Sequence, residues 1–133
     1  MAGPARVLVV EDDHGTREVI GEALKLLGYA VTEASSAAEA TQRADFDLAL
    51  LDIHLPDGSG LSVLKAWREK GLDAPVLIIT ADRAAAAVDK ALVSLDAWDY
   101  LSKPFDLESL ETSIREALAR ANERRSIEKR LAG

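Results

Sequence analysis

The stretch that decides the fold is Val7-Leu8-Val9-Val10-Glu11-Asp12-Asp13, an apolar run that ends in three adjacent carboxylates. The run is continuous rather than alternating, which is typical of a strand buried on both faces of a sheet. Unit charges about 4 Å apart near a protein surface repel by roughly 1 to 4 kcal/mol, so three adjacent acids usually have a function or lie in solvent. Taken alone, the acids are better explained as a helix cap, at Asp12 or Asp13, with solvated neighbours.

Outward from this stretch, apolar runs alternate with segments of helical periodicity. Strands are predicted at residues 6–10, 29–34, 47–51, 75–79 and 98–102. Helices are predicted from His14 up to Gly28, from the capping box Ser36–Glu39 to about Ala44, from residue 61 up to Gly71, from about residue 83, and from about Asp106. The last helix carries an apolar stripe at Leu107, Leu110, Ile114, Ala117 and Ala121, and residues 54–60 have the composition of a loop.

Strands that alternate with helices five times predict an α/β domain with a doubly wound, five-stranded parallel sheet. The first, third and fourth strands are the most apolar and should be central. The second and fifth carry polar residues and should be edges. The predicted strand order is therefore 2-1-3-4-5, the flavodoxin-like (βα)5 arrangement.

The composition is that of one ordinary globular domain, with 133 residues of which 48% are hydrophobic and 29% charged. The absence of cysteine excludes a disulfide framework, a thiolate metal site and a cysteine nucleophile, and it suits the cytoplasm. A net charge of −7 argues against nucleic acid binding by the surface of this domain. No apolar run is long enough to span a membrane.

Reactive side chains follow four of the predicted strands. Residues 11–13 follow the first strand, Asp52 the third, Thr80 the fourth and Lys103 the fifth. Ligands of open parallel sheets bind outside the carboxyl ends of the strands, where the strand order reverses, here between the first and third strands. A turn aspartate, a strand-end threonine and a surface lysine each have a structural explanation. Their convergence on one edge of the sheet favours a functional site.

The chemistry of this set is coherent. Clustered carboxylates favour a hard divalent cation such as Mg²⁺. An aspartate is a competent nucleophile toward phosphorus and forms an acyl phosphate. Phosphoryl transfer mainly requires positioning and neutralisation of oxygen charge, which Mg²⁺ and Lys103 would supply, while Thr80 could bind a phosphoryl oxygen.

With these motifs, the sequence resembles the receiver domain of two-component response regulators. The resemblance covers about residues 5–121 and is carried by residues 7–13, 52–60, 80–81 and 99–105. It implies that Asp52 accepts a phosphoryl group from a sensor histidine kinase, and that Thr80 and Lys103 contact this group. It also implies that Glu11, Asp12 and Asp52 hold Mg²⁺ together with the backbone carbonyl of His54.

The resemblance implies a conformational switch as well. Thr80 and Tyr100 would be the switch residues, and the fourth helix, fifth strand and fifth helix would form the signalling surface. The peptide bond before Pro104 is expected to be cis. The protein would be a cytoplasmic phosphoprotein of a phosphorelay in transcription regulation, and no enzyme beyond its own phosphoryl acceptance and hydrolysis.

The C-terminal segment is the other informative feature. The resemblance predicts a receiver domain at residues 1–121 and a helical extension or linker at residues 122–133. Ile127 and Leu131 lie four residues apart in this otherwise charged segment. It is either a solvated extension or a linker that pairs in a homodimer or leads to an output domain. The signalling surface is the alternative homodimer interface. Residues 97–101 and the tail are most similar to receivers that precede ATPase-type transcription activators.

Two other functions remain as alternatives. A haloacid-dehalogenase-type phosphatase also uses Mg²⁺ and an aspartyl nucleophile, but it requires a second aspartate two residues later, where this chain has His54. Turnover of a phosphomonoester would support it, whereas stoichiometric self-phosphorylation supports the receiver. A pseudo-receiver interaction module would typically lack Asp52 or Lys103. A nucleotide-binding module is disfavoured because the chain has neither G-x-G-x-x-G nor a P-loop.

Overall fold

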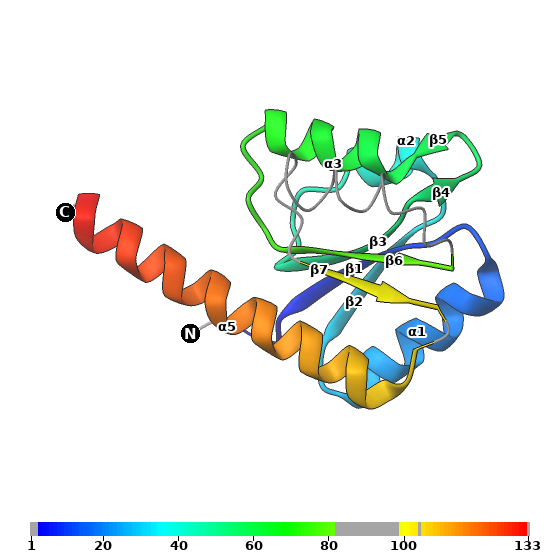
Figure 1. Cartoon of the computed structure of the whole chain (residues 1–133), viewed down its shortest axis with the longest axis horizontal. Coiled ribbons are helices and arrows are strands. Elements are labelled where there is room, and N and C mark those ends of the chain that lie inside the picture. Colours follow the sequence, from blue (N-terminus) through cyan, green and yellow to red (C-terminus); the bar gives the residue numbers. More distant parts are fainter. Residues whose placement is uncertain (1–2, 82–98, 104, 133) are drawn as a thin grey trace.

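The computed structural model describes residues 3–81, 99–103 and 105–132 of the chain. Five parallel strands form one sheet, with helices on both of its faces (Figure 1). The strand order is β2-β1-β3-β6-β7. Because β6 and β7 are the fourth and fifth of these strands along the chain, the predicted order 2-1-3-4-5 is confirmed.

The bounds of the elements agree closely with the sequence pattern. The sheet contains β1 (Arg6–Val10), β2 (Ala30–Ala34), β3 (Leu48–Asp52), β6 (Val76–Thr80) and β7 (Asp99–Ser102). The described helices are α1 (His14–Leu26), α2 (Ala37–Thr41), α3 (Gly60–Glu69) and α5 (Leu107–Ala132). Where the sequence predicted only a loop, β4 (His54–Leu55) and β5 (Gly58–Ser59) form a short antiparallel hairpin. The predicted helix from about residue 83 lies outside the described residues.

Side chains of the central strands alternate between two hydrophobic cores. One core packs the sheet against α2 and α3, and its largest member is the fully buried Trp67. The other packs the opposite face against α1 and α5 (Figure 1). Burial of apolar surface contributes about 25 cal/mol per Å², so covering both faces of the sheet is the main stabilisation of the fold.

Local sequence signals set the helix ends. Gly28 and Gly71 follow α1 and α3 with positive φ angles of 93° and 83°, a conformation that glycine adopts readily after a helix. The side chain of Ser36 caps α2 by accepting a hydrogen bond from the backbone N–H of Glu39. This confirms the predicted N-cap at Ser36, but the side chain of Glu39 accepts from the backbone N–H of Ser35, at 3.2 Å, rather than from that of Ser36. Helix α2 ends at Thr41 rather than near Ala44.

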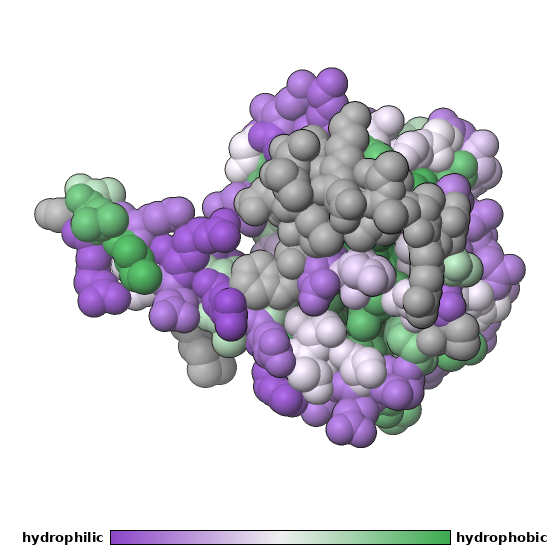
Figure 2. Space-filling model, viewed as in Figure 1, coloured by the Kyte–Doolittle hydropathy of each residue, from purple (hydrophilic) through white to green (hydrophobic). Residues whose placement is uncertain are grey.

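Helix α5 has 26 residues and continues well beyond the sheet (Figure 1). Its buried residues are Leu110, Ile114 and Ala117, whereas Leu107 is 48% exposed, so the buried stripe begins one turn later than predicted. Residues 122–132 are exposed on every side. Figure 2 shows this extension as a mainly hydrophilic arm with a hydrophobic patch near its end. Among the helices just described, none is long and apolar enough to cross a bilayer.

Candidate functional site

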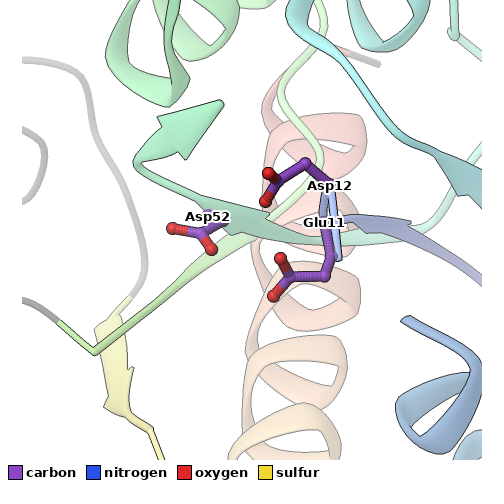
Figure 3. Close-up of side chains that lie close together, drawn as sticks. All are labelled: Glu11, Asp12 and Asp52. Atoms are coloured by element: carbon purple, nitrogen blue, oxygen red, sulfur yellow. The ribbon is translucent and has the colours of Figure 1, made fainter. Parts of the chain in front are cut away.

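The carboxyl ends of neighbouring strands gather the predicted site residues at one edge of the sheet. Glu11 follows β1, Asp52 ends β3, Thr80 ends β6 and Lys103 follows β7. Figure 3 shows the side chains of Glu11, Asp12 and Asp52 grouped at the ends of β1 and β3. Oxygen atoms of these three carboxylates all lie within 4.8 Å of one another. Residues far apart in the sequence therefore form one acidic cluster.

The ammonium group of Lys103 lies between two of these acids. Its Nζ donates a hydrogen bond of 2.8 Å to Oδ2 of Asp52 and another to Oε1 of Glu11. The backbone orients this lysine, because β7 pairs in parallel with β6 and the N–H of Lys103 donates to the carbonyl oxygen of Thr80 at 2.9 Å. Lys103 thus joins the ends of three strands.

The cluster has a buried side and an exposed side. Glu11 is 1% exposed, Thr80 1% and Asp52 6%, whereas Asp12 faces solvent. Burial raises the pKa of Glu11 above its usual range, although hydrogen bonds from Lys103 and from the backbone N–H of Asp13 oppose this shift. Burial lowers the pKa of Lys103, but its hydrogen bonds to Asp52 and Glu11 outweigh this effect and leave the pKa raised. Lys103 is therefore a firmly charged cation at neutral pH.

The three adjacent acids after β1 have separate roles. Oδ2 of Asp13 accepts hydrogen bonds from the backbone N–H of Thr16 at 2.8 Å and from the hydroxyl group of Thr16 at 2.7 Å. These bonds make Asp13 the N-cap of α1 and lower its pKa. The capping explanation of the acidic run therefore holds for Asp13, while Glu11 and Asp12 turn toward Asp52 (Figure 3).

The backbone after Asp52 is held close to its carboxylate. The N–H of His54 donates to Oδ1 of Asp52 at 3.0 Å, and the N–H of Gly60 donates to the carbonyl oxygen of Ile53 at 2.7 Å. A Cβ atom at position 60 would overlap the carbonyl oxygen of Asp52 and lie 3.0 Å from Cα of Ile53. Gly60 is therefore required for the close return of the chain past Asp52.

The hairpin after Asp52 is also tied to a neighbouring helix. Oδ1 of Asp57 accepts from the N–H of Ala37 at 2.7 Å, and Oδ2 accepts from the N–H of Ala38 at 2.9 Å. Asp57 thus binds backbone groups that the first turn of α2 leaves without a helical partner. Sequence reasoning missed Gly60 and Asp57 as site-supporting residues. Their sequence signals were their place in the turn 56–60 and in the stretch 52–60 that carries the family resemblance.

The predicted switch residues differ in their surroundings. Thr80 is buried at the end of β6, whereas Tyr100, on the edge strand β7, is 41% exposed. The peptide bond before Pro104 lies outside the described residues, so its cis geometry stays a prediction.

The donor chemistry of the cluster fits a hard cation. The grouped ligand atoms are carboxylate oxygens from Glu11, Asp12 and Asp52, and Mg²⁺ is commonly bound by one or two carboxylates together with water and phosphate oxygen atoms. Beside them, Asp52 offers a nucleophilic oxygen and Lys103 a fixed positive charge. The arrangement is suited to phosphoryl transfer onto a carboxylate.

Comparison with known proteins gives a consistent result. The sequence model described as "Response regulator receiver domain" matches residues 7–115. The transcriptional regulatory protein PmrA of Pectobacterium parmentieri is 42% identical over 123 residues, which cover 89% of this chain and 54% of PmrA. The response regulator protein PmrA of Pseudomonas aeruginosa is 41% identical over 126 residues, covering 92% of this chain and 56% of that protein. This chain spans about half the length of these curated relatives.

A solved structure extends this similarity to three dimensions. The crystal structure of a CheY-like response regulator receiver domain protein from Methanospirillum hungatei superimposes with a TM-score of 0.84 at 28% identity. The match covers 92% of this chain and 99% of that one. The strand order and the flanking helices are thus those of a known fold.

Proposed function

This chain belongs to the response regulator receiver domain family, and from this membership we propose that Asp52 is its phosphoacceptor. Receiver domains of two-component response regulators receive phosphoryl groups from sensor histidine kinases and are generally not enzymes in the usual sense. One observation carries the assignment to Asp52. Its carboxylate ends a central strand, accepts a hydrogen bond from Lys103 and lies within 4.8 Å of the carboxylates of Glu11 and Asp12.

In the proposed reaction, a carboxylate oxygen of Asp52 attacks the phosphorus atom of a phosphohistidine. A new O–P bond forms while the N–P bond breaks, and its electron pair stays on the histidine nitrogen. The ammonium group of Lys103 then binds a phosphoryl oxygen in place of the Asp52 oxygen. The hydroxyl group of Thr80 donates a hydrogen bond to a second phosphoryl oxygen.

We further propose that Glu11, Asp12 and Asp52, with the backbone carbonyl of His54, hold Mg²⁺. When bound, the cation supplies positive charge that stabilises the oxygen atoms of the transferring group. The carboxylate donor set and the exposure of Asp12 support this proposal, because the former suits a hard cation and the latter leaves the cluster open to solvent.

The proposed switch starts from the added charge, since phosphorylation contributes about −1.5 to −2 charges. Thr80 would move toward the phosphoryl group, and Tyr100 would turn from its exposed position into the space that Thr80 leaves. The signalling surface would comprise the predicted helix from about residue 83 together with β7 and α5. Such a switch biases two existing states of the domain.

The proposed domain organisation is a receiver at residues 1–121 followed by a helical linker at residues 122–133. The greater length of the relatives supports an output domain after this linker, and PmrA of Pectobacterium parmentieri is described as a transcriptional regulatory protein. The linker or the signalling surface would form a homodimer, and nucleic acid would contact the output domain rather than this one. The proposed site of action is the cytoplasm.

The decisive test is phosphorylation of the Asp52→Asn variant by a small phosphodonor with Mg²⁺, followed by intact mass spectrometry. We expect the wild-type chain to gain at most one phosphoryl group and the variant to gain none, with an unchanged circular dichroism spectrum. Asp45→Asn is the matched control, because Asp45 is an exposed acid paired with Arg6 before β3. Labelling of Asp52→Asn to the wild-type level would overturn the assignment, and multiple turnover of a phosphomonoester would favour a phosphatase.

A further inference from the structure

The side chain of Arg17 lies against the backbone of the acidic turn that follows β1. Arg17 belongs to α1, and its side chain is only 14% exposed. Its Nη1 donates a hydrogen bond of 2.7 Å to the carbonyl oxygen of Glu11 and a longer one of 3.3 Å to that of Asp12. Arg17 thus binds the backbone of two acids whose carboxylates join the cluster.

The rest of the guanidinium group is anchored on other elements. Its Nε donates to Oε1 of Glu33 on β2 at 3.1 Å, and its Nη2 lies 3.2 Å from Nδ1 of His14 at the start of α1. The planar fork of an arginine can satisfy several acceptors in fixed directions, which a lysine cannot do. The acidic turn is therefore linked through Arg17 to both α1 and β2.

We propose that Arg17 is a positioning residue for the magnesium site. By fixing the carbonyl groups of Glu11 and Asp12, it aims the carboxylates of these residues at Asp52. This inference rests on the proposed function, because it concerns the same cation. Lys103 donates hydrogen bonds to the carboxylates of Glu11 and Asp52. Arg17 instead donates to the backbone carbonyl oxygens of Glu11 and Asp12.

Charge and positioning predict opposite effects when Arg17 is removed. Arginine and Mg²⁺ are both positive, so an effect of charge alone would make Arg17→Ala bind Mg²⁺ more tightly. Loss of positioning would make it bind more weakly, because the carboxylates would no longer be held together. Arg17→Lys separates the two effects further, since it keeps the charge but loses the fork that reaches Glu11, Asp12 and Glu33.

The test is calorimetric titration of the wild-type chain, Arg17→Ala and Arg17→Lys with Mg²⁺. We expect both variants to bind Mg²⁺ about 10- to 100-fold more weakly, which is the usual effect of removing a residue that supports metal ligands. Arg115→Ala is the matched control, because Arg115 is an exposed arginine of α5 that pairs with Glu111 at 2.9 Å. Its Mg²⁺ affinity should equal that of the wild-type chain.

A second readout separates positioning from general damage to the fold. The Mg²⁺ concentration that half-saturates phosphorylation should rise in Arg17→Lys, while the rate at saturating Mg²⁺ stays within about threefold of wild type, because high Mg²⁺ restores the ordered site. Circular dichroism identifies any unfolded variant, and Arg17→Lys decides the matter if Arg17→Ala does not fold. Tighter Mg²⁺ binding by Arg17→Ala, or wild-type Mg²⁺ affinity in Arg17→Lys, overturns the inference about Arg17 but leaves the proposed function standing. Absence of Mg²⁺ binding by the wild-type chain overturns the proposed function and this inference with it.

Discussion

The Nζ atom of Lys103 lies 2.8 Å from Oδ2 of Asp52, although the two residues are 51 positions apart in the sequence. Asp52 ends β3 and Lys103 follows β7, so the lysine side chain reaches past the end of the intervening strand β6. The same ammonium group binds Glu11, which makes one cation the shared partner of two buried acids. We therefore expect the stability of this edge of the sheet to depend on the same lysine that we propose binds the phosphoryl group.

Replacing this shared cation should expose the repulsion between the acids. We expect Lys103→Ala to lower the free energy of unfolding by about 1–3 kcal/mol, because it leaves Glu11 and Asp52 without a charged hydrogen-bond donor. Added Mg²⁺ should raise the melting temperature of the variant more than that of the wild-type chain. Thermal unfolding with and without Mg²⁺ measures both effects. Equal Mg²⁺-dependent shifts in the two proteins would contradict a common pocket for the lysine and the cation.

The link between Asp57 and α2 should make part of the stability dependent on pH. Hydrogen bonds from the N–H groups of Ala38 and Ala37 hold the pKa of Asp57 below its ordinary value of 3.8. The stabilisation is therefore complete above pH 3.8 and is lost as the pH falls through the lower folded-state pKa. Asp57→Asn should be less stable than the wild-type chain at neutral pH, and the difference should shrink in acid.

Urea unfolding at neutral pH and well below pH 3.8 measures this change for Asp57. Asp45→Asn serves as the control, because a surface ion pair such as that of Asp45 with Arg6 contributes little to stability. A stability difference between Asp57→Asn and the wild-type chain that persists unchanged in acid would show that the charged form of Asp57 does not support α2.

Gly60 should tolerate no side chain. In Gly60→Ala the new methyl group would meet the carbonyl group of Asp52, and we expect a loss of about 1–3 kcal/mol or more in unfolding free energy. The rate of phosphorylation should also fall, because the backbone that carries Asp52 and His54 must shift. Gly15→Ala is the control: its Cβ would make only an ordinary contact, 3.5 Å from Asp13, in the first turn of α1. Unchanged stability of Gly60→Ala would show that the chain can shift at no cost to relieve the contact with the carbonyl group of Asp52.

The strand order and most of the cluster could be predicted because they depend on patterns that survive in the linear sequence. Continuous apolar runs mark the central strands, and the parallel arrangement then places Asp52, Thr80 and Lys103 at the same edge. No knowledge of side-chain packing was needed for that step. The prediction was correct because the geometry of a parallel sheet fixes which ends meet.

The remaining features depend on distances that no pattern of residue types specifies. The sequence predicted the cap of α1 at Asp12 or Asp13, and the extended backbone of Asp13, with φ −73° and ψ 116°, decides between them. The hairpin of β4 and β5 is too short to produce a recognisable alternation. Leu107 is exposed although it is the first residue of α5 and fits the apolar spacing of that helix. The hydrogen bond from Arg17 on α1 to Glu33 on β2 is a tertiary contact, which the local sequence pattern does not predict.

The exposed end of α5 should be dispensable for the fold. The last buried residue of this helix is Ala117, so a chain that ends at Ala121 should unfold with a free energy within about 0.5 kcal/mol of the full-length value. If the extension pairs in a dimer, Ile127→Ser with Leu131→Ser should sediment with the molar mass of a monomer, whereas the full-length wild-type chain should sediment with that of a dimer. Urea unfolding and analytical ultracentrifugation measure the two effects. A large loss of stability in the shortened chain would contradict a separate extension.

Residues 122–132 of α5 form an arm that projects from the part of the helix packed on the sheet. At 1.5 Å per residue this arm is about 16 Å long, so a tilt of about 10° at its base displaces its tip by about 3 Å. The base of the helix directly follows the segment that carries Lys103. Any tilt of α5 against the sheet would therefore be enlarged along this arm, and the largest displacement would fall where a following domain would be attached.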